Sequence, residues 1–194
     1  MLLDSSNKIT RKKILAWEMW GIAFIFLIGA FLHFVFELSG ENIAVGLIGG
    51  VNESVWEHIK IGFWPAFIWA VIEFFILGRK VKNFLIAKGV SFVLIGVFIT
   101  GIYYLVVSLG IENLAVDITN FFISVALAQI ISYRLILVKR HYKVLSIIGI
   151  VLILLNIAAF SLLSYFPPGC PIFRDPISGG YGIFPTEHMS GWRF

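Results

Sequence analysis

The sequence contains a single cysteine and few charged residues. Because Cys170 stands alone, the chain can form neither an intrachain disulfide nor a cysteine-rich metal site. Charged residues make up 13% of the chain and apolar residues 59%, against about 25% and roughly 45–50% in soluble globular domains. A water-soluble fold of 194 residues cannot bury so many aliphatic and aromatic side chains. The composition therefore predicts a membrane protein whose main partner is the lipid bilayer.

The positive charge of the chain does not indicate a nucleic-acid partner. The formal net charge is +4, but the lysine and arginine residues gather at the ends of long apolar runs. This distribution is typical of membrane orientation and not of phosphate binding. The first apolar run, from about Ile14 to Leu38, is longer than the apolar region of about 7–15 residues in a secretory signal sequence, and it lacks a small-residue cleavage site. We therefore expect it to be retained as a helix.

Five segments are long and apolar enough to cross a bilayer. A helical span needs about 20 apolar residues, and the segments that meet this requirement are 15–38, 53–77, 84–109, 114–138 and 144–165. The sequence therefore predicts an all-α membrane protein in which residues 1–165 form a bundle of five transmembrane helices.

The positions of lysine and arginine predict how the bundle is oriented. Basic residues occur in the N-terminal arm, between the second and third predicted helices and between the fourth and fifth, whereas the connections 39–52 and 110–113 carry none. Cytoplasmic loops of membrane proteins collect positive charge. This alternation predicts a cytoplasmic N-terminus and an extracytoplasmic C-terminus, in the inner (cytoplasmic) membrane of the cell.

With this orientation, most acidic residues fall on the extracytoplasmic side. Eight of the eleven acids lie there: Glu37, Glu41, Glu53, Glu57, Glu112, Asp117, Asp175 and Glu187. The stretch 40–51 on the same side is apolar, glycine-rich and too short to span, which predicts a short interfacial helix or a re-entrant loop. Irregular backbone at membrane depth is tolerated only against protein or a water-filled cavity.

The last 29 residues, 166–194, differ in composition from the bundle. They hold five of the six prolines and five glycines, which prevent another spanning helix. They also keep too many aromatic and aliphatic side chains for a solvated disordered tail. We expect this segment to fold as an extracytoplasmic cap over the outer mouth of the bundle. There Arg174 could offset negative charge, and Asp175 or His188 could add a ligand, although a surface role is the simpler expectation for each.

Ionisable and polar side chains near the outer ends of three predicted helices form the candidate site, because such groups are costly in lipid. Several are three or four residues apart and therefore share a helix face, and the topology places all of them at similar depth. The candidate metal ligands are His33, Glu37, Glu53, Glu57 and His58. The candidate ligand-binding residues are Glu53, Glu57, His58, Lys60, Asp117 and Asn120.

Three functions are compatible with these residues. Carboxylates and imidazoles suit a divalent cation such as zinc, iron or manganese, although the sequence has no His-Glu-x-x-His or Glu-x-x-His pattern. The leading prediction is binding of a cation or small polar ligand, which proton-exchanging carboxylates could couple to transport. The first alternative is a metal-dependent intramembrane hydrolase acting on a lipid-borne substrate. The second is a non-catalytic membrane scaffold that binds lipid or a partner protein.

Some of these charges also have a purely structural interpretation. Glu53 in a first helical turn complements the helix dipole, and Glu57 can form an ion pair with Lys60. Glu73 lies near the inner end of the second predicted helix, close in sequence to Arg79 and Lys80. We therefore expect Glu73 to form an ion pair at the membrane surface.

Three stretches carry a resemblance to a known family: residues 33–40 (HFVFELSG), residues 52–60 (NESVWEHIK) with Pro65 downstream, and Asp175-Pro176 followed by Gly180-Tyr181-Gly182. On these residues the chain resembles a family of small, uncharacterised multi-pass membrane proteins of bacteria and archaea. The resemblance covers most of the chain. It implies a multi-pass topology and no particular activity.

Overall fold

The computed structural model describes residues 11–111 and 113–183 and consists mainly of helices. The long helices are α1 (Arg11–Leu38), α2 (Val55–Ile76), α3 (Phe84–Ser108), α4 (Leu114–Ile136) and α5 (Lys143–Leu162). Short 3-10 turns lie in the connections: η1 (Val45–Leu47), η2 (Gly78–Lys80) and η3 (Pro171–Phe173). All five long helices have the length and composition needed to cross a membrane. This confirms the predicted all-α fold class with five such helices.

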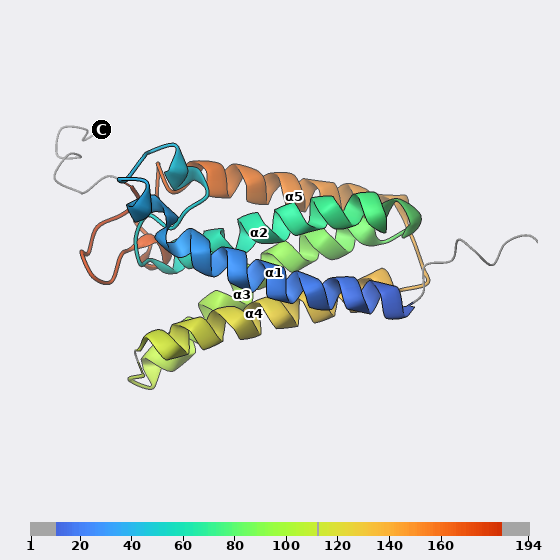
Figure 1. Cartoon of the computed structure of the whole chain (residues 1–194), viewed down its shortest axis with the longest axis horizontal. Helices are drawn as coiled ribbons and strands as arrows, with labels where there is room; N and C mark the ends of the chain where they lie inside the picture. Colours follow the sequence, from blue (N-terminus) through green and yellow to red (C-terminus); the bar gives the residue numbers. More distant parts are fainter. Residues whose placement is uncertain (1–10, 112, 184–194) are drawn as a thin grey trace, which may run out of the picture.

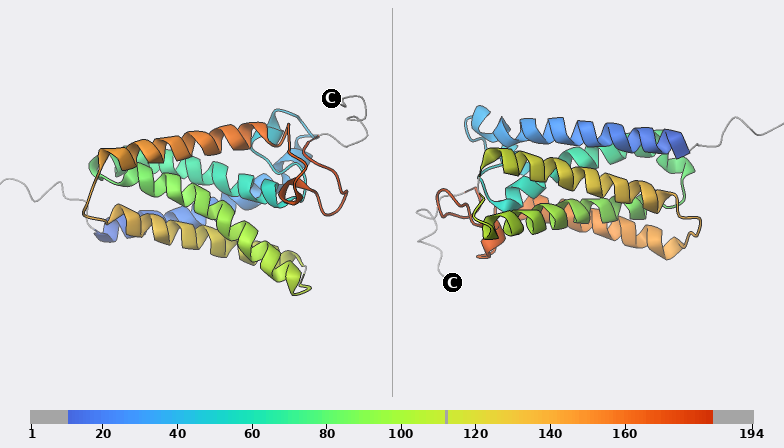
Figure 2. Two further views of the ribbon diagram at one scale, coloured as in Figure 1. Left: turned by 180° about the vertical axis from the view of Figure 1, so that it is seen from behind. Right: turned by 90° about the horizontal axis from the view of Figure 1, so that it is seen from below.

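Four of the helices form a ring, and α5 packs on its outside. Helix α1 contacts α2 and α4, and α3 contacts α2, α4 and α5. Figures 1 and 2 show all five helices running along a common long axis. Helix α5 also reaches α2 through Phe160, whose ring stacks on Trp56 and Phe63. Consecutive helices run in opposite directions, so the connections gather at the two ends of the bundle.

The two ends differ in chemistry. We call one the tail end, which comprises residues 39–54, 109–111 and 163–183; it lies on the left in Figure 1. The other is the basic end, which comprises residues 77–83 and 137–142 and the start of α1. The tail end corresponds to the side predicted to be extracytoplasmic, and the basic end to the side predicted to be cytoplasmic.

The outside of the bundle is apolar. Leu27 is 65% exposed and Leu154 is 58% exposed, and Gly149 and Phe160 are the buried residues of α5. An apolar surface of this extent is stable only against another apolar phase, which lipid supplies. The apolar interior is built around Ile25, Phe63, Phe92, Ile95 and Val125.

Helices α3 and α5 approach each other closely at two glycines. A Cβ atom at Gly149 of α5 would lie 2.4 Å from the carbonyl carbon of Leu85, and one at Gly89 of α3 would lie 2.7 Å from the Gly149 carbonyl oxygen. Small residues let transmembrane helices pack backbone against backbone. The position of α5 therefore depends on this glycine pair.

Both irregular segments of the tail end pack onto the bundle. The hydroxyl of Tyr165, just after α5, donates to the Ile43 carbonyl at 2.7 Å. Further along the tail, the buried ring of Phe173 lies 4.5 Å from the Trp56 ring, and the Ile183 N–H donates to the carbonyl of Ser164. The predicted segment 166–194 can be followed to Ile183, and residues 184–194, including His188, lie outside the described part of the chain.

Candidate functional site

Three of the predicted metal ligands lie together at the tail end. His33 comes from the C-terminal part of α1, Glu53 from the connection just before α2, and His58 from the first turn of α2. The Glu53 Oε2 atom lies 3.4 Å from His33 Nε2 and 3.7 Å from His58 Nε2. One ligand atom from each residue lies within 4.8 Å of the other two. We call this group the His–Glu–His cluster.

Hydrogen bonds around the start of α2 hold Glu53 in this position. The Asn52 side chain accepts from the Ser54 N–H at 2.9 Å and donates to the Gly182 carbonyl at 3.0 Å. Ser54 is the N-cap of α2, and its hydroxyl accepts a hydrogen bond from the first turn. Upstream, the Gly50 N–H donates to a carbonyl oxygen of α1 at 3.1 Å. The segment that carries Glu53 is therefore fixed to α1, to α2 and to the tail.

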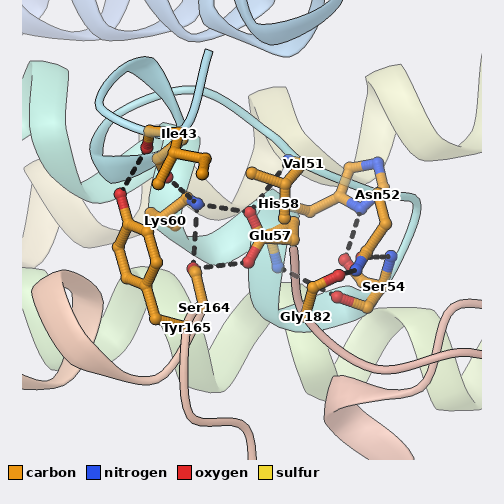
Figure 3. Close-up of polar contacts among 11 residues, drawn as sticks. Ile43, Val51, Asn52, Ser54, Glu57, His58, Lys60, Ser164, Tyr165 and Gly182 are labelled. Atoms are coloured by element: carbon orange, nitrogen blue, oxygen red, sulfur yellow. Dashed lines mark hydrogen bonds and ion pairs between the residues drawn. The ribbon is translucent and has the colours of Figure 1, made fainter. Parts of the chain in front are cut away.

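The proton positions in the cluster leave a place for a cation. His58 Nδ1 lies 3.0 Å from the Ser54 carbonyl oxygen (Figure 3). A carbonyl oxygen can only accept, so Nδ1 carries the proton and Nε2 presents its lone pair toward Glu53. The hydrogen bond from His33 holds the pKa of the Glu53 carboxyl below its ordinary value, so this group is ionised at neutral pH. A lone pair facing a carboxylate is repelled by it unless a proton or metal cation lies between them.

The spacing and supporting contacts fit a transition metal. In a tetrahedral zinc site with bonds of about 2.0–2.1 Å, neighbouring ligand atoms are about 3.3–3.4 Å apart, close to the 3.4 and 3.7 Å separations that Glu53 makes. Histidine ligands usually donate their second ring N–H to a carbonyl or carboxylate, which fixes the ring. The bond from His58 to Ser54 supplies this contact. Two imidazoles and one carboxylate also form the ligand set of several catalytic zinc sites.

A cavity of about 380 Å³ opens beside the cluster. Its lining residues come from the start of α2, the end of α3, the start of α4 and the tail, and in Figure 1 the α3–α4 hairpin diverges from the other helices at this end. Its lining includes four of the predicted ligand-binding residues, Glu53, His58, Asp117 and Asn120, with apolar side chains of α3 and α4 and two residues of the tail. Pockets that bind small molecules have volumes of about 300–1,000 Å³ and a few polar groups in an apolar lining.

The tail also reaches the cluster through Asp175. Burial opposes ionisation of this carboxyl, but hydrogen bonds from the Ser178 hydroxyl and from the backbone amides of Ile177, Ser178 and Glu53 outweigh it and hold the pKa of Asp175 below its ordinary value. Asp175 is therefore an ionised group that anchors the tail next to Glu53.

Glu57 and Lys60 belong to a different arrangement, which Figure 3 shows. Lys60 Nζ lies 2.5 Å from Glu57 Oε2 and donates to the Gly46 carbonyl at 2.7 Å and the Ser164 hydroxyl at 2.9 Å. The Ser164 hydroxyl donates to Glu57 Oε1 at 2.6 Å, and the Val51 N–H donates to Oε2 at 3.1 Å. Lys60 and Glu57 are 0% and 2% exposed. We call this group the Lys60 network.

The structure therefore divides the predicted site residues. Glu57 is directed toward Lys60 and Ser164, whereas the His58 ring points in a different direction, toward Ser54. Glu37 is exposed on α1 and is not part of the His–Glu–His cluster. Asn120 lines the cavity, while its amide donates to the Ile99 carbonyl at 3.0 Å.

A second buried charged group, nearer the basic end, is absent from the candidate site drawn from the sequence. Lys88 Nζ lies 2.8 Å from Glu18 Oε1 and 2.6 Å from Glu73 Oε2, and each side chain is at most 2% exposed. We call this group the Glu–Lys–Glu cluster. The prediction that Glu73 forms a surface ion pair is wrong, because Glu73 is fully buried against Lys88. The sequence did contain a signal for this cluster: Glu18, Glu73 and Lys88 each lie inside a predicted span, about one helical turn from its end.

Comparison with known proteins places the chain in a family. The sequence model of a family of unknown function (DUF6512) matches residues 6–183. The chain belongs to this family. No curated protein and no solved structure matches it. The family assignment agrees with the resemblance to an uncharacterised family, and the matched range contains every residue of the His–Glu–His cluster, the Lys60 network and the Glu–Lys–Glu cluster.

Proposed function

We propose that this membrane protein binds a divalent transition-metal cation, such as zinc, at the His–Glu–His cluster. The observation that carries the proposal is the pairing of an imidazole lone pair of His58 with the ionised carboxylate of Glu53, at a spacing close to that of zinc ligands. His33 supplies the third ligand atom. Solvent or substrate would complete the coordination from the adjoining cavity.

Titration of the purified protein tests this proposal. The protein in detergent is stripped with a chelator and titrated with zinc against a competing indicator. We expect one tight site per chain, and a loss of at least about tenfold in affinity in Glu53→Gln and His58→Ala. Glu37→Gln is the matched control, because it removes a nearby carboxylate outside the cluster and should leave the affinity unchanged. Equal affinity in all four proteins would show that zinc binds elsewhere or adventitiously.

We also propose that the tail end faces the extracytoplasmic side of the inner (cytoplasmic) membrane, with residues 166–183 as a cap. The lysine and arginine residues at the basic end support this orientation, and the contact of Asp175 with Glu53 supports the cap. A reporter fused after Phe194 should be active only outside the cytoplasm, and one fused near Lys80 only inside. The reverse result at either position would contradict the orientation.

Hydrolysis of a lipid-borne substrate is the second candidate, and the cavity favours it. His33, Glu53 and His58 would hold the zinc ion, and a bound zinc would supply a nucleophilic water by lowering its pKa to about 7. The cavity is mainly apolar, and Asp117 in its lining would be the candidate base. The test is turnover of membrane-soluble esters and phospholipids by zinc-loaded protein. Activity that survives in Glu53→Gln, or that Asp117→Asn leaves unchanged, would contradict this assignment.

Transport through the bundle has less support. On each ring helix, a fully buried apolar residue lies between the polar groups of the two ends (Ile25, Phe63, Ile95 and Val125), and on α4 the buried Ser124 is a polar side chain in this layer. A hydrated ion path requires polar side chains or water through this layer, so movement of the cation across the membrane would need a second conformation. The cavity at the tail end fits a ligand that enters and leaves from one side.

A further inference from the structure

The Glu–Lys–Glu cluster is surrounded by the whole ring of helices. Glu18 comes from α1, Glu73 from α2 and Lys88 from α3, and Ser132 of α4 donates to Glu18 Oε1 at 2.8 Å. Two carboxylates share one ammonium group, so the cluster carries a net charge of −1 if all three side chains are ionised. An uncompensated charge buried in a low-dielectric interior is strongly disfavoured. Some cation must therefore neutralise the cluster.

Lys88 is the cation that the structure shows paired with both carboxylates of the cluster. The charged groups that act on Glu73 are Lys88 and Glu18. Helix α4 contributes the neutral Ser132 and Gln129. The nearby cations of η2 and the first turn of α1 are exposed; of these, the Arg79 guanidinium lies over the Phe75 ring at 4.8 Å.

Several buried polar atoms around the cluster have no hydrogen-bond partner among the described residues. They are Glu18 Oε2, Glu73 Oε1, Gln129 Nε2 and Trp69 Nε1. The last two meet at Gly21, where a Cβ atom would lie 2.4 Å from Gln129 Nε2 and 2.6 Å from Trp69 Nε1. Buried polar groups are normally paired, so the two carboxylate oxygens, Glu18 Oε2 and Glu73 Oε1, are the atoms of the cluster that are available to carry an added proton.

We propose that the Glu–Lys–Glu cluster is an intramembrane proton-binding site in which Glu18 and Glu73 together hold one proton. A proton restores neutrality and needs only one carboxylate oxygen. A metal cation would need several oxygen ligands. The carboxylate oxygens that remain are Glu18 Oε2 and Glu73 Oε1, the Ser132 hydroxyl already donates to Glu18, and the Lys88 ammonium and the N–H groups of Gln129 and Trp69 cannot ligate a cation. Because the two carboxylates share Lys88, the proton belongs to the pair and not to either residue.

Loss of this proton would change the charge of the cluster from zero to −1. When the proton leaves, a net negative charge remains at the centre of the four-helix ring, and the ring must open to water or shift to stabilise it. Helices α1 and α2 carry Glu18 and Glu73, and they also carry His33 and His58. The site therefore lies on the same two helices as the His–Glu–His cluster, although the proton-binding proposal does not depend on metal binding.

Infrared spectroscopy of the purified chain in lipid vesicles tests the proposal through the carbonyl stretch of a protonated carboxylic acid. At neutral pH the wild-type protein should show one such group, and isotope-labelled glutamate should shift its band. Glu73→Gln and Glu18→Gln should each lose the band, because either change leaves a neutral ion pair. Lys88→Met should double it, because both carboxylates then need a proton. Glu41→Gln, an exposed control, should leave it unchanged.

Each alternative result would overturn the proposal. A wild-type protein without the band has ionised carboxylates and a different counterion, and a band that disappears on addition of sodium identifies that counterion as a metal cation. A band that persists in both glutamine variants belongs to another residue. Thermal melting of each variant checks that it is folded, and if Lys88→Met does not fold, the two glutamine variants and Glu41→Gln still decide the outcome. Zinc titration of Glu73→Gln separates this result from the His–Glu–His proposal, because that variant should keep its zinc affinity.

Discussion

The Lys60 network permits a quantitative prediction, because every group in it has a partner. The three N–H bonds of the Lys60 ammonium meet the Glu57 carboxylate, the Gly46 carbonyl and the Ser164 hydroxyl. The perturbation is Lys60→Met, which keeps the length of the side chain and removes its charge. It leaves the Glu57 carboxylate, which is 2% exposed, with the Ser164 hydroxyl and the Val51 N–H as its remaining donors.

The expected cost comes from this stranded charge. Removing one partner of a buried ion pair destabilises proteins by about 3–5 kcal/mol, whereas replacing both partners by groups of similar volume is often neutral or stabilising. Lys60→Met should therefore lower the free energy of unfolding by about 3–5 kcal/mol. The double variant Glu57→Gln/Lys60→Met should recover to within about 1–2 kcal/mol of the wild type, since only neutral acceptors then lack a donor.

The assay is denaturant unfolding in detergent micelles, followed by tryptophan fluorescence and by helical circular dichroism. Lys82→Met is the matched control, because Lys82 is exposed at the basic end, and its effect should be within about 0.5 kcal/mol. A Lys60→Met protein as stable as the wild type would refute the reasoning. So would a double variant less stable than the single variant, because the loss would then come from side-chain packing and not from an unpaired charge.

Three further predictions test other parts of the structure. Gly149→Val should prevent α5 from packing on α3, because a Cβ atom there overlaps the α3 backbone, and the yield of folded protein and its melting temperature measure this. Phe173→Ala removes the ring packed on Trp56 and should let the tail detach, so that trypsin cuts after the exposed Arg174 in right-side-out membranes faster than in the wild type, where the packed tail should resist. Zinc affinity should fall as the pH drops below about 6.5, where histidine ordinarily takes up a proton. Because Glu53 stays ionised to a pH below its ordinary range, a loss of affinity seen only below pH ~4 would contradict histidine ligation.

The five helices were predictable because their signal is local. An apolar run of sufficient length has few alternatives to a spanning helix, and the structure places each helix end within a few residues of the predicted boundary. The ion pair between Glu57 and Lys60 was also open to prediction, since residues three apart share a helix face. Ser164, more than 100 residues away in sequence, gives no such signal, and its place between them depends on how α5 meets α2.

Helical spacing alone could not separate Glu57 from His58. Adjacent residues on a helix point about 100° apart, so these two side chains had to face different surroundings, but the sequence does not state which helix packs on which face. Packing of α1 on α2 brings His33 to Glu53 and His58, and the connection 40–51 and the end of α5 receive Glu57. The predicted set of metal ligands is divided by this tertiary arrangement.

The Glu–Lys–Glu cluster was missed because a charge near the end of a spanning helix is ordinary. Lys88 follows a basic connection in the sequence, and Glu73 precedes the same connection, so both fit the membrane surface. Both side chains are nevertheless buried, because the ring of four helices encloses Lys88 near the start of α3 and Glu73 in the last turn of α2. The number of residues between a side chain and the end of its helix therefore underestimates its burial wherever neighbouring helices cover that end.

The three charged groups of this protein differ in whether their polar atoms have partners within the chain, and this difference suggests which of them are structural and which are functional. The Lys60 network buries a charge pair as deeply as any other group and satisfies all three of its ammonium donors within the chain, so its contribution is to position the tail end. The His–Glu–His cluster instead directs a lone pair at a carboxylate, and the Glu–Lys–Glu cluster leaves two carboxylate oxygens without hydrogen-bond partners among the described residues. We propose an added cation for each of these two arrangements: a metal for the first and a proton for the second. Burial cost alone would single out the Lys60 network and the Glu–Lys–Glu cluster and would pass over the His–Glu–His cluster, whose side chains are partly exposed. The unmet demand for positive charge is instead the feature on which both functional proposals rest.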